Sequence, residues 1–141
     1  MEVDRKEAFR QRTKKFASVV IRFYCELPKN RMECQVIGKQ LLRSGTSVAA
    51  NYREASRARS NAEFVSKIEL CTQETDESEL WLELLREDCG IKSDRLDWLL
   101  DESNQLISYK MKITLSSLGR RGLDRPDRIV YSFCIHNAAW R

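Results

Sequence analysis

The apolar residues of this chain recur alternately every three and four positions in four long segments, and this spacing constrains the fold more than any other feature. The clearest stripe consists of Phe9, Thr13, Phe16, Val20, Phe23 and Leu27. Residues at this spacing fall on one face of an α-helix. Glycine (5) and proline (2) are scarce among the 141 residues, which suits long helices better than a sheet with many turns. The sequence therefore predicts an all-α fold.

Local signals place the boundaries of the first two predicted helices. The first helix spans about residues 4–27 and ends before Pro28, because the residue that precedes a proline is disfavoured in the α region. Asn30 is the predicted N-cap of the second helix, which runs to about Arg57 and has Glu33 in its first turn.

Two further helices follow. Ser60 and Glu63 match the S-x-x-E capping box directly before a periodic apolar run, so they are the predicted helix cap of the third helix. Ser93 is the predicted cap of the fourth, which ends before Gly119. Because the links between helices are short, we expect an up-down-up-down antiparallel four-helix bundle.

The bundle is predicted to occupy residues 1–118 as one domain, since a chain of this length accommodates one core. Residues 119–141 contain two glycines and a proline and carry no helical stripe, so they are predicted to form an irregular or disordered C-terminal tail. Two alternatives remain for this tail: a short strand-like segment packed on the bundle or on a partner, and an ending unrelated to the domain.

A stripe of polar residues lies beside the apolar arc of the second helix. If the second and third helices form an antiparallel hairpin, Ser44 faces Thr75 and Ser47 faces Thr72. We therefore predict a polar packing layer at mid-height of the bundle, whose hydroxyl groups bond to one another and fix the register. Its members are Ser44, Ser47, Asn51, Thr72, Thr75 and Ser78. Small residues around Gly45 require either close approach of a neighbouring helix or a short break.

Charge is distributed unevenly along the chain. Residues 1–60 hold 14 Lys/Arg and 6 Asp/Glu, whereas residues 61–118 hold 6 Lys/Arg and 13 Asp/Glu. Three interpretations are open: a basic face that binds phosphates, two opposite surfaces that meet within or between subunits, and solvated helix faces that do neither. The candidate nucleic-acid-binding residues are Lys39, Arg43, Arg53, Arg57 and Arg59, joined by Arg10, Arg12, Lys14 and Lys15 of the first helix.

Signals of catalysis are absent from the sequence. The single histidine, His136, lies in the tail, so the carboxylate–histidine sets of di-metal bundles cannot be built, and no phosphate-binding glycine motif is present. We expect a protein that is not an enzyme and has no metal, cofactor or small-molecule substrate. Its five cysteines lack C-x-x-C spacing and are expected to be reduced. Without a long apolar run, we expect a cytoplasmic protein with no membrane partner.

The segment QLLRSGTSVAANYREASRARSNAEF, together with Leu27-Pro28 and the run ELWLELL at 79–85, resembles the bacterial four-helix-bundle family whose members occur in intervening sequences of 23S ribosomal RNA genes. The resemblance covers about residues 7–110. The positions that match the motif are Arg43, Ser44, Ser47, Asn51, Glu54, Arg57, Ser60, Glu63, Phe64 and Lys67. It implies an up-and-down bundle that assembles into five-fold rings, and relatives in retroelements are basic accessory proteins that associate with nucleic acid and a reverse transcriptase. It implies no catalytic residue.

These observations lead to one expected function and one alternative. The expected function is a non-catalytic bundle that forms a homo-oligomeric ring, a homopentamer by the resemblance, and binds RNA or DNA through a basic surface of the first two helices. In the alternative, the chain is a protein–protein interaction scaffold without a nucleic-acid role. A basic first half and an acidic second half on one rigid bundle suit the contact between successive subunits that either function requires.

Overall fold

Four long helices make up the computed structural model, which describes residues 2–118 of the chain and the side chains of residues 5–110, 112 and 113. They are α1 (Glu2–Glu26), α2 (Met32–Ser56), α3 (Asn61–Glu87) and α4 (Asp94–Leu118). No strand occurs between residues 2 and 118, which confirms the predicted all-α class. The predicted tail, residues 119–141, lies outside the described residues.

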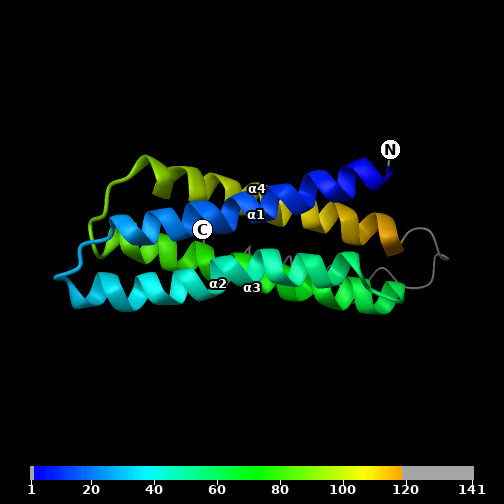
Figure 1. Cartoon of the computed structure of the whole chain (residues 1–141), viewed down its shortest axis with the longest axis horizontal. Helices are drawn as coiled ribbons and strands as arrows, with labels where there is room; N and C mark the ends of the chain where they lie inside the picture. The colour runs from blue at the N-terminus through cyan, green and yellow to red at the C-terminus, as the bar shows by residue number, and fades with distance from the viewer. Residues whose placement is uncertain (1, 119–141) are drawn as a thin grey trace.

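The helices pack lengthwise into a bundle (Figure 1). α1 and α3 each contact both α2 and α4, so every helix has two neighbours. The α1–α2 and α3–α4 connections lie at one end of the bundle and the α2–α3 connection at the other (Figure 1). None of the helices, within the residues that the structure describes, combines the length and hydropathy needed to span a lipid bilayer.

The core of the bundle contains the apolar stripes predicted from the sequence. All six stripe residues of α1, from Phe9 to Leu27, are at most 3% exposed. In α2 the apolar residues Leu41, Val48, Tyr52 and Ala55 are buried, and Ile37 packs against the core at its edge. Burial of these side chains supplies most of the stabilisation, because isolated helices of this length are marginal in water.

The helix ends test the predicted caps. At α3, the Ser60 hydroxyl accepts the N–H of Glu63, and the Glu63 carboxylate accepts the N–H of Arg59 at 2.8 Å, so the predicted cap is confirmed. Ser93 likewise accepts the N–H of Arg95 before α4. The predicted Asn30 cap is wrong, because α2 begins one residue later and Arg31 occupies the N-cap position without a side-chain cap bond.

Arg31 explains why the start of α2 is displaced. Its guanidinium donates to the Cys89 carbonyl at 2.8 Å and to the Glu33 carboxylate. These bonds tie the start of α2 to the segment that follows α3, and they also raise the pKa of Arg31, chiefly through the hydrogen bond to Glu33. A tertiary contact thus replaces the local Asx cap that the sequence suggested.

At Gly45, α1 packs closely against α2. A Cβ atom built at Gly45 would lie 2.8 and 2.9 Å from the two methyl carbons of Val20, closer than real Cβ atoms come to other heavy atoms. α2 is continuous through this position. Of the two alternatives considered from the sequence, close approach of a neighbouring helix is therefore confirmed, and a break is wrong.

Gly45→Ala should lower the free energy of unfolding by about 1 kcal/mol, although alanine is the better helix former by about 1 kcal/mol. The added methyl group collides with Val20, whose β-branched side chain is fully buried and cannot rotate away. In a Val20→Ala background the same substitution should instead stabilise the fold, because the two colliding methyl carbons are removed and only the Cβ of residue 20, at 3.2 Å, stays near the added atom. Urea denaturation of the four proteins measures this change of sign, and a stabilising effect in both backgrounds would contradict the packing described here.

Candidate functional site

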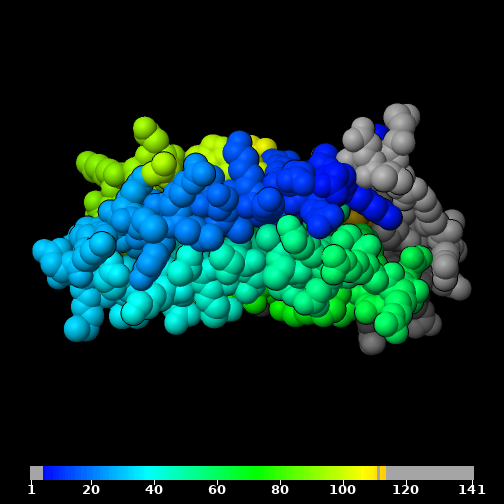
Figure 2. All heavy atoms as spheres, in the orientation of Figure 1, coloured from blue at the N-terminus to red at the C-terminus, as the bar shows by residue number. Residues whose placement is uncertain are grey.

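A basic stripe runs along the outer face of α2. At about 100° per residue, Lys39, Arg43, Arg53 and Arg57 lie within roughly 40° of one direction around the helix axis. Lys39, Arg53 and Arg57 are exposed, as is Arg59 just beyond the helix. None of these four makes an ion pair with another residue of the described chain. α1 and α2 together form one continuous face of the molecule (Figure 2).

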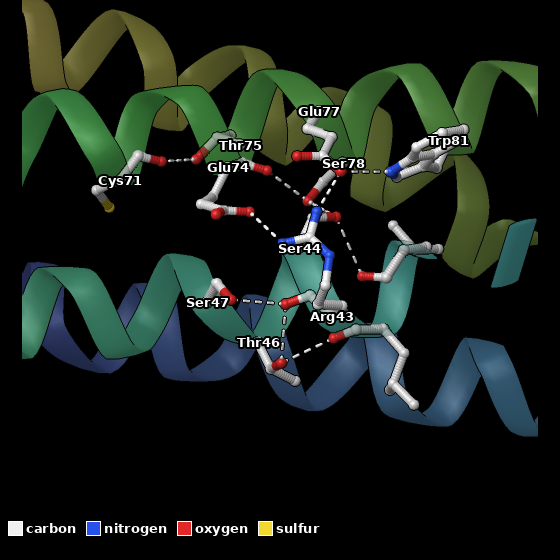
Figure 3. A network of polar contacts seen from close by, with 12 residues as sticks. Arg43, Ser44, Thr46, Ser47, Cys71, Glu74, Thr75, Glu77, Ser78 and Trp81 are labelled. Atoms are coloured by element: carbon white, nitrogen blue, oxygen red, sulfur yellow. Dashed lines mark hydrogen bonds and ion pairs between the residues drawn. The ribbon is translucent and has the colours of Figure 1, made fainter. Parts of the chain in front are cut away.

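Arg43 differs from the other cations of this stripe. Its guanidinium pairs with two carboxylates of α3, Glu77 and Glu74, the latter at 3.3 Å (Figure 3). The hydrogen bond with Glu77 raises the pKa of Arg43 and lowers that of Glu77. Trp81 donates its indole N–H to the same Glu77 carboxylate at 3.2 Å. Arg43 is therefore engaged within the chain and contributes to the contact between α2 and α3.

The predicted polar layer takes a different pairing from the one expected. Ser78 donates to Ser44 at 2.8 Å, so the partner of Ser44 lies about one helical turn beyond the predicted Thr75 (Figure 3). Both serines are fully buried. The predicted contact of Ser47 with Thr72 is not made, since each hydroxyl bonds to a carbonyl of its own helix. Asn51 is half-buried on the same side of α2. Only the serine pair links the two helices by a hydroxyl–hydroxyl bond.

Thr75 instead belongs to a buried group around Lys110 of α4. The Lys110 ammonium, on a residue that is fully buried, donates to the Cys71 carbonyl at 3.0 Å and to the Thr75 hydroxyl. Burial lowers the pKa of Lys110 because the charged form is poorly solvated there. The pKa of the Cys71 thiol is raised by burial as well, although Lys110 acts in the opposite direction.

α1 is tied to α4 by a second ion pair. Arg12 donates through Nε and Nη2 to the two carboxylate oxygens of Glu102, at 2.5 and 3.0 Å. Glu102 is 6% exposed. The hydrogen bond to Glu102 raises the pKa of Arg12. Lys15, a second predicted cation of α1, lies 5.4 Å from the ring centroid of Trp98. Two of the predicted cations of α1, Arg12 and Lys15, thus contact residues of α4.

One flank of α3 is acidic. Asp76, Glu79 and Glu83 lie three and four residues apart and so share one side of the helix. Burial raises the pKa of Glu79, and the charges of Glu83 and Asp76 raise it further. Such a group is stabilised when an external cation approaches. This face is chemically the complement of the basic stripe.

Within the part of the chain that the structure describes, no group of three or more histidine, cysteine or acidic side chains is placed to hold a metal ion. Cys34, Cys71 and Cys89 are buried thiols, and Cys25 is an exposed one. His136 and Cys134 lie outside the described residues. The described residues offer charged surfaces and a buried serine pair as candidate sites.

Comparison with known proteins identifies the relatives of this bundle. The model of the 23S rRNA-intervening sequence protein family matches residues 5–111. The chain belongs to the 23S rRNA-intervening sequence protein family. A crystal structure of a protein of unknown function from the S23 ribosomal protein family of Bacteroides thetaiotaomicron is similar, with 32% sequence identity and a TM-score of 0.70. The similarity covers 77% of this chain and 96% of the other. No curated protein matches the chain.

Residues 40–67, which carried the resemblance to this family, serve mainly to hold α2 against α3. Ser44 bonds to α3, Ser60 and Glu63 cap it, and Lys67 pairs with Glu54 of α2 at 2.5 Å. Arg57 remains on the open basic stripe. In this member of the family, the motif therefore combines packing with a small exposed cationic surface.

Sequence reasoning missed two buried ions, Lys110 and Glu102. The spacing contained a signal for Lys110, because it follows Leu99, Ser103 and Leu106 at steps of four, three and four on the inward face of α4. Glu102 lies beside that face, next to Ser103. No comparable signal indicates its partner Arg12, since that contact depends on how α1 and α4 are placed relative to one another.

Proposed function

We propose that this member of the 23S rRNA-intervening sequence protein family is a non-catalytic ring-forming protein that binds RNA or DNA through the basic surface of α1 and α2. One observation carries the proposal: Lys39, Arg53, Arg57 and Arg59 are exposed, and none forms an ion pair with another described residue. Cations that are not neutralised within the chain are available to replace the counterions of a phosphate backbone.

The spacing of these cations fits an extended polyanion. From Lys39 to Arg57 the stripe covers 18 residues of helix, or about 27 Å at 1.5 Å per residue. This length spans several phosphates of a nucleic-acid strand. Phosphate contacts of this kind do not read sequence, so the expected binding is general and strongly dependent on salt.

Charge complementarity supports self-association into a ring. The acidic side of α3, around Asp76, Glu79 and Glu83, offers carboxylates to the basic face of a second copy. The pKa of Glu79 is raised by burial and by neighbouring carboxylates, so a cation from that copy would stabilise its charged form. A contact between two different faces of the same chain repeats around an axis and closes into a ring. The family resemblance favours five subunits, and we propose a cytoplasmic homopentamer.

The proposal includes the path of the chain through the bundle. We infer an up-down-up-down antiparallel arrangement, which the order of contacts supports. Phe9 packs against Tyr52, whereas Val20 packs against Gly45, so α1 and α2 meet with residue numbers running in opposite directions. Arg12 meets Glu102 while Glu26 meets Arg95, which gives the same relation between α1 and α4.

Size-exclusion chromatography with light scattering, with and without a structured RNA, tests assembly and binding in one measurement. We expect a mass near five subunits without RNA and a larger complex with RNA that dissociates as salt is raised. A monomeric mass at micromolar concentration would contradict the ring. A ring that never gains mass with RNA would favour the alternative function, a protein–protein scaffold, in which the basic face is used only between subunits.

A further inference from the structure

A basic pocket lies at the end of the bundle where α2 connects to α3. Its cavity has a volume of about 630 Å³ and is lined by the first turns of α1 and α3, the last residues of α2 and the last turns of α4. This end is the one that carries the α2–α3 connection in Figure 1. The volume is within the range of pockets that bind small organic ligands.

The charged side chains that the described residues contribute to the pocket wall have one sign. Arg5, Lys6, Arg59 and Lys112 line the cavity, and none of the described residues that line it is acidic. These four cations make no ion pair with any residue between 5 and 113. The nearby Glu63 carboxylate accepts the backbone N–H of Arg59 and leaves the Arg59 guanidinium available. A cavity with this lining attracts anions, because low-dielectric walls focus the field of the cations.

The first turn of α3 adds backbone donors to the same wall. Ser60 and Asn61 line the cavity, and Ser60 caps the helix through the N–H of Glu63. The N–H groups at the start of an α-helix have no acceptor within the helix and carry its positive dipole end. Phosphate groups bind at such positions. Cations from α1, from α4 and from the α2–α3 connection line the same cavity.

Aromatic rings complete the lining. Phe64 and Tyr109 are half-buried, so part of each ring faces the cavity. Tyr109 is held from behind by Phe9, with ring centroids 4.8 Å apart and an interplanar angle of 16°. Tyr52 is almost fully buried beneath them, and burial raises its pKa to about 12, so its hydroxyl stays neutral. A rigid aromatic surface beside an anion site suits a nucleobase attached to a phosphate.

We propose that this pocket binds a nucleotide: its phosphate contacts the cations and the start of α3, and its base stacks on Phe64 or Tyr109. The source of the nucleotide is the 5′-phosphorylated end of an RNA strand or a free nucleoside monophosphate. The first source rests on the proposed nucleic-acid function and deepens it, because the basic stripe of α2 leads to this end through Arg57 and Arg59.

Fluorescence competition and calorimetry on the full chain test the proposal with four probes: AMP, inorganic phosphate, and a ten-nucleotide single-stranded RNA with a 5′-phosphate or a 5′-hydroxyl end. We expect the 5′-phosphorylated RNA to bind about tenfold more tightly than the hydroxyl form, and AMP to bind more tightly than phosphate. The double variant Arg59→Gln/Lys112→Gln should remove both preferences. Phe64→Leu should bring AMP down to the level of phosphate.

Matched controls separate the pocket from the stripe. Lys39→Gln/Arg53→Gln removes the same charge outside the pocket, so it should weaken both RNAs together and keep the ratio between them. AMP binding without discrimination between the RNAs assigns the pocket to a free nucleotide. Equal affinity for both RNAs with no AMP binding overturns the pocket and leaves the proposed function intact. AMP binding without RNA binding supports the pocket and contradicts the proposed nucleic-acid function.

Discussion

Arg12→Met should lower the free energy of unfolding by about 3 kcal/mol, the lower end of the range for breaking a buried ion pair. The substitution leaves the Glu102 carboxylate, which is 6% exposed, without the two N–H groups that it accepts at 2.5 and 3.0 Å. The methionine retains the apolar stem of the arginine, so the lost stability reflects the removed ion pair rather than lost packing. Arg12 itself is one-third exposed, which is why the upper end of the range is not expected.

A double-mutant cycle isolates this pair from the rest of the core. Arg12→Met/Glu102→Leu replaces both ions with apolar side chains and should recover most of the lost stability, because no charge then remains buried. Urea denaturation of the wild type, the two single variants and the double variant gives the coupling energy. If Arg12→Met costs less than about 1 kcal/mol, the pair behaves like a solvated surface bridge and the contact between α1 and α4 rests on packing alone.

Replacing three cations of the basic stripe should weaken RNA binding about 100-fold near 0.1 M salt, since each phosphate contact on a single strand contributes about 0.7 to the slope of log K against log salt. The variant is Lys39→Gln/Arg53→Gln/Arg57→Gln, and none of these side chains forms an ion pair within the described chain. The salt slope itself should fall by about two. Fluorescence polarisation with a labelled RNA at several salt concentrations measures both quantities.

The control for this variant removes three charges that do not belong to the stripe. Arg86→Gln/Lys92→Gln/Arg95→Gln alters exposed residues of α3, of the α3–α4 connection and of α4. It should change the affinity less than about threefold, because these residues are not on the face of α2 along which the strand is proposed to run and exposed charges are partly screened at 0.1 M salt. Equal losses in the two variants would mean that net charge, rather than the stripe, governs binding.

The helices and their inward faces followed from local sequence patterns. The stripe from Phe9 to Leu27 is buried as predicted, and Ser60 caps α3 as predicted. Both signals act within a few residues of the chain, through the helical repeat and the unsatisfied N–H groups of the first turn. The Asn30 cap is not formed, and α2 begins after Arg31, whose guanidinium donates to the Cys89 carbonyl, 58 residues away in the chain.

Candidate site residues were predicted less well, because residue type does not reveal a tertiary partner. Arg43 and Arg57 occupy equivalent positions on the α2 stripe, yet only Arg43 lies opposite carboxylates of α3. Ser44 was expected to meet Thr75 and instead bonds to Ser78, a difference of nearly one helical turn, or about 4.5 Å along the axis. An offset of that size decides which polar groups meet while leaving the apolar stripes in contact.

The sequence by itself determined that this chain forms four helices, which face of each is apolar, and that positive charge is concentrated in the first half. These properties depend on periodicity, capping and composition, all of which are local. Only the tertiary structure decided that Lys110 and Glu102 are buried ions, that Arg43 is neutralised, and that basic residues of α1, of α4 and of the α2–α3 connection meet the start of α3 around one cavity. Those outcomes depend on the rotation and axial offset of packed helices, which no single helix specifies.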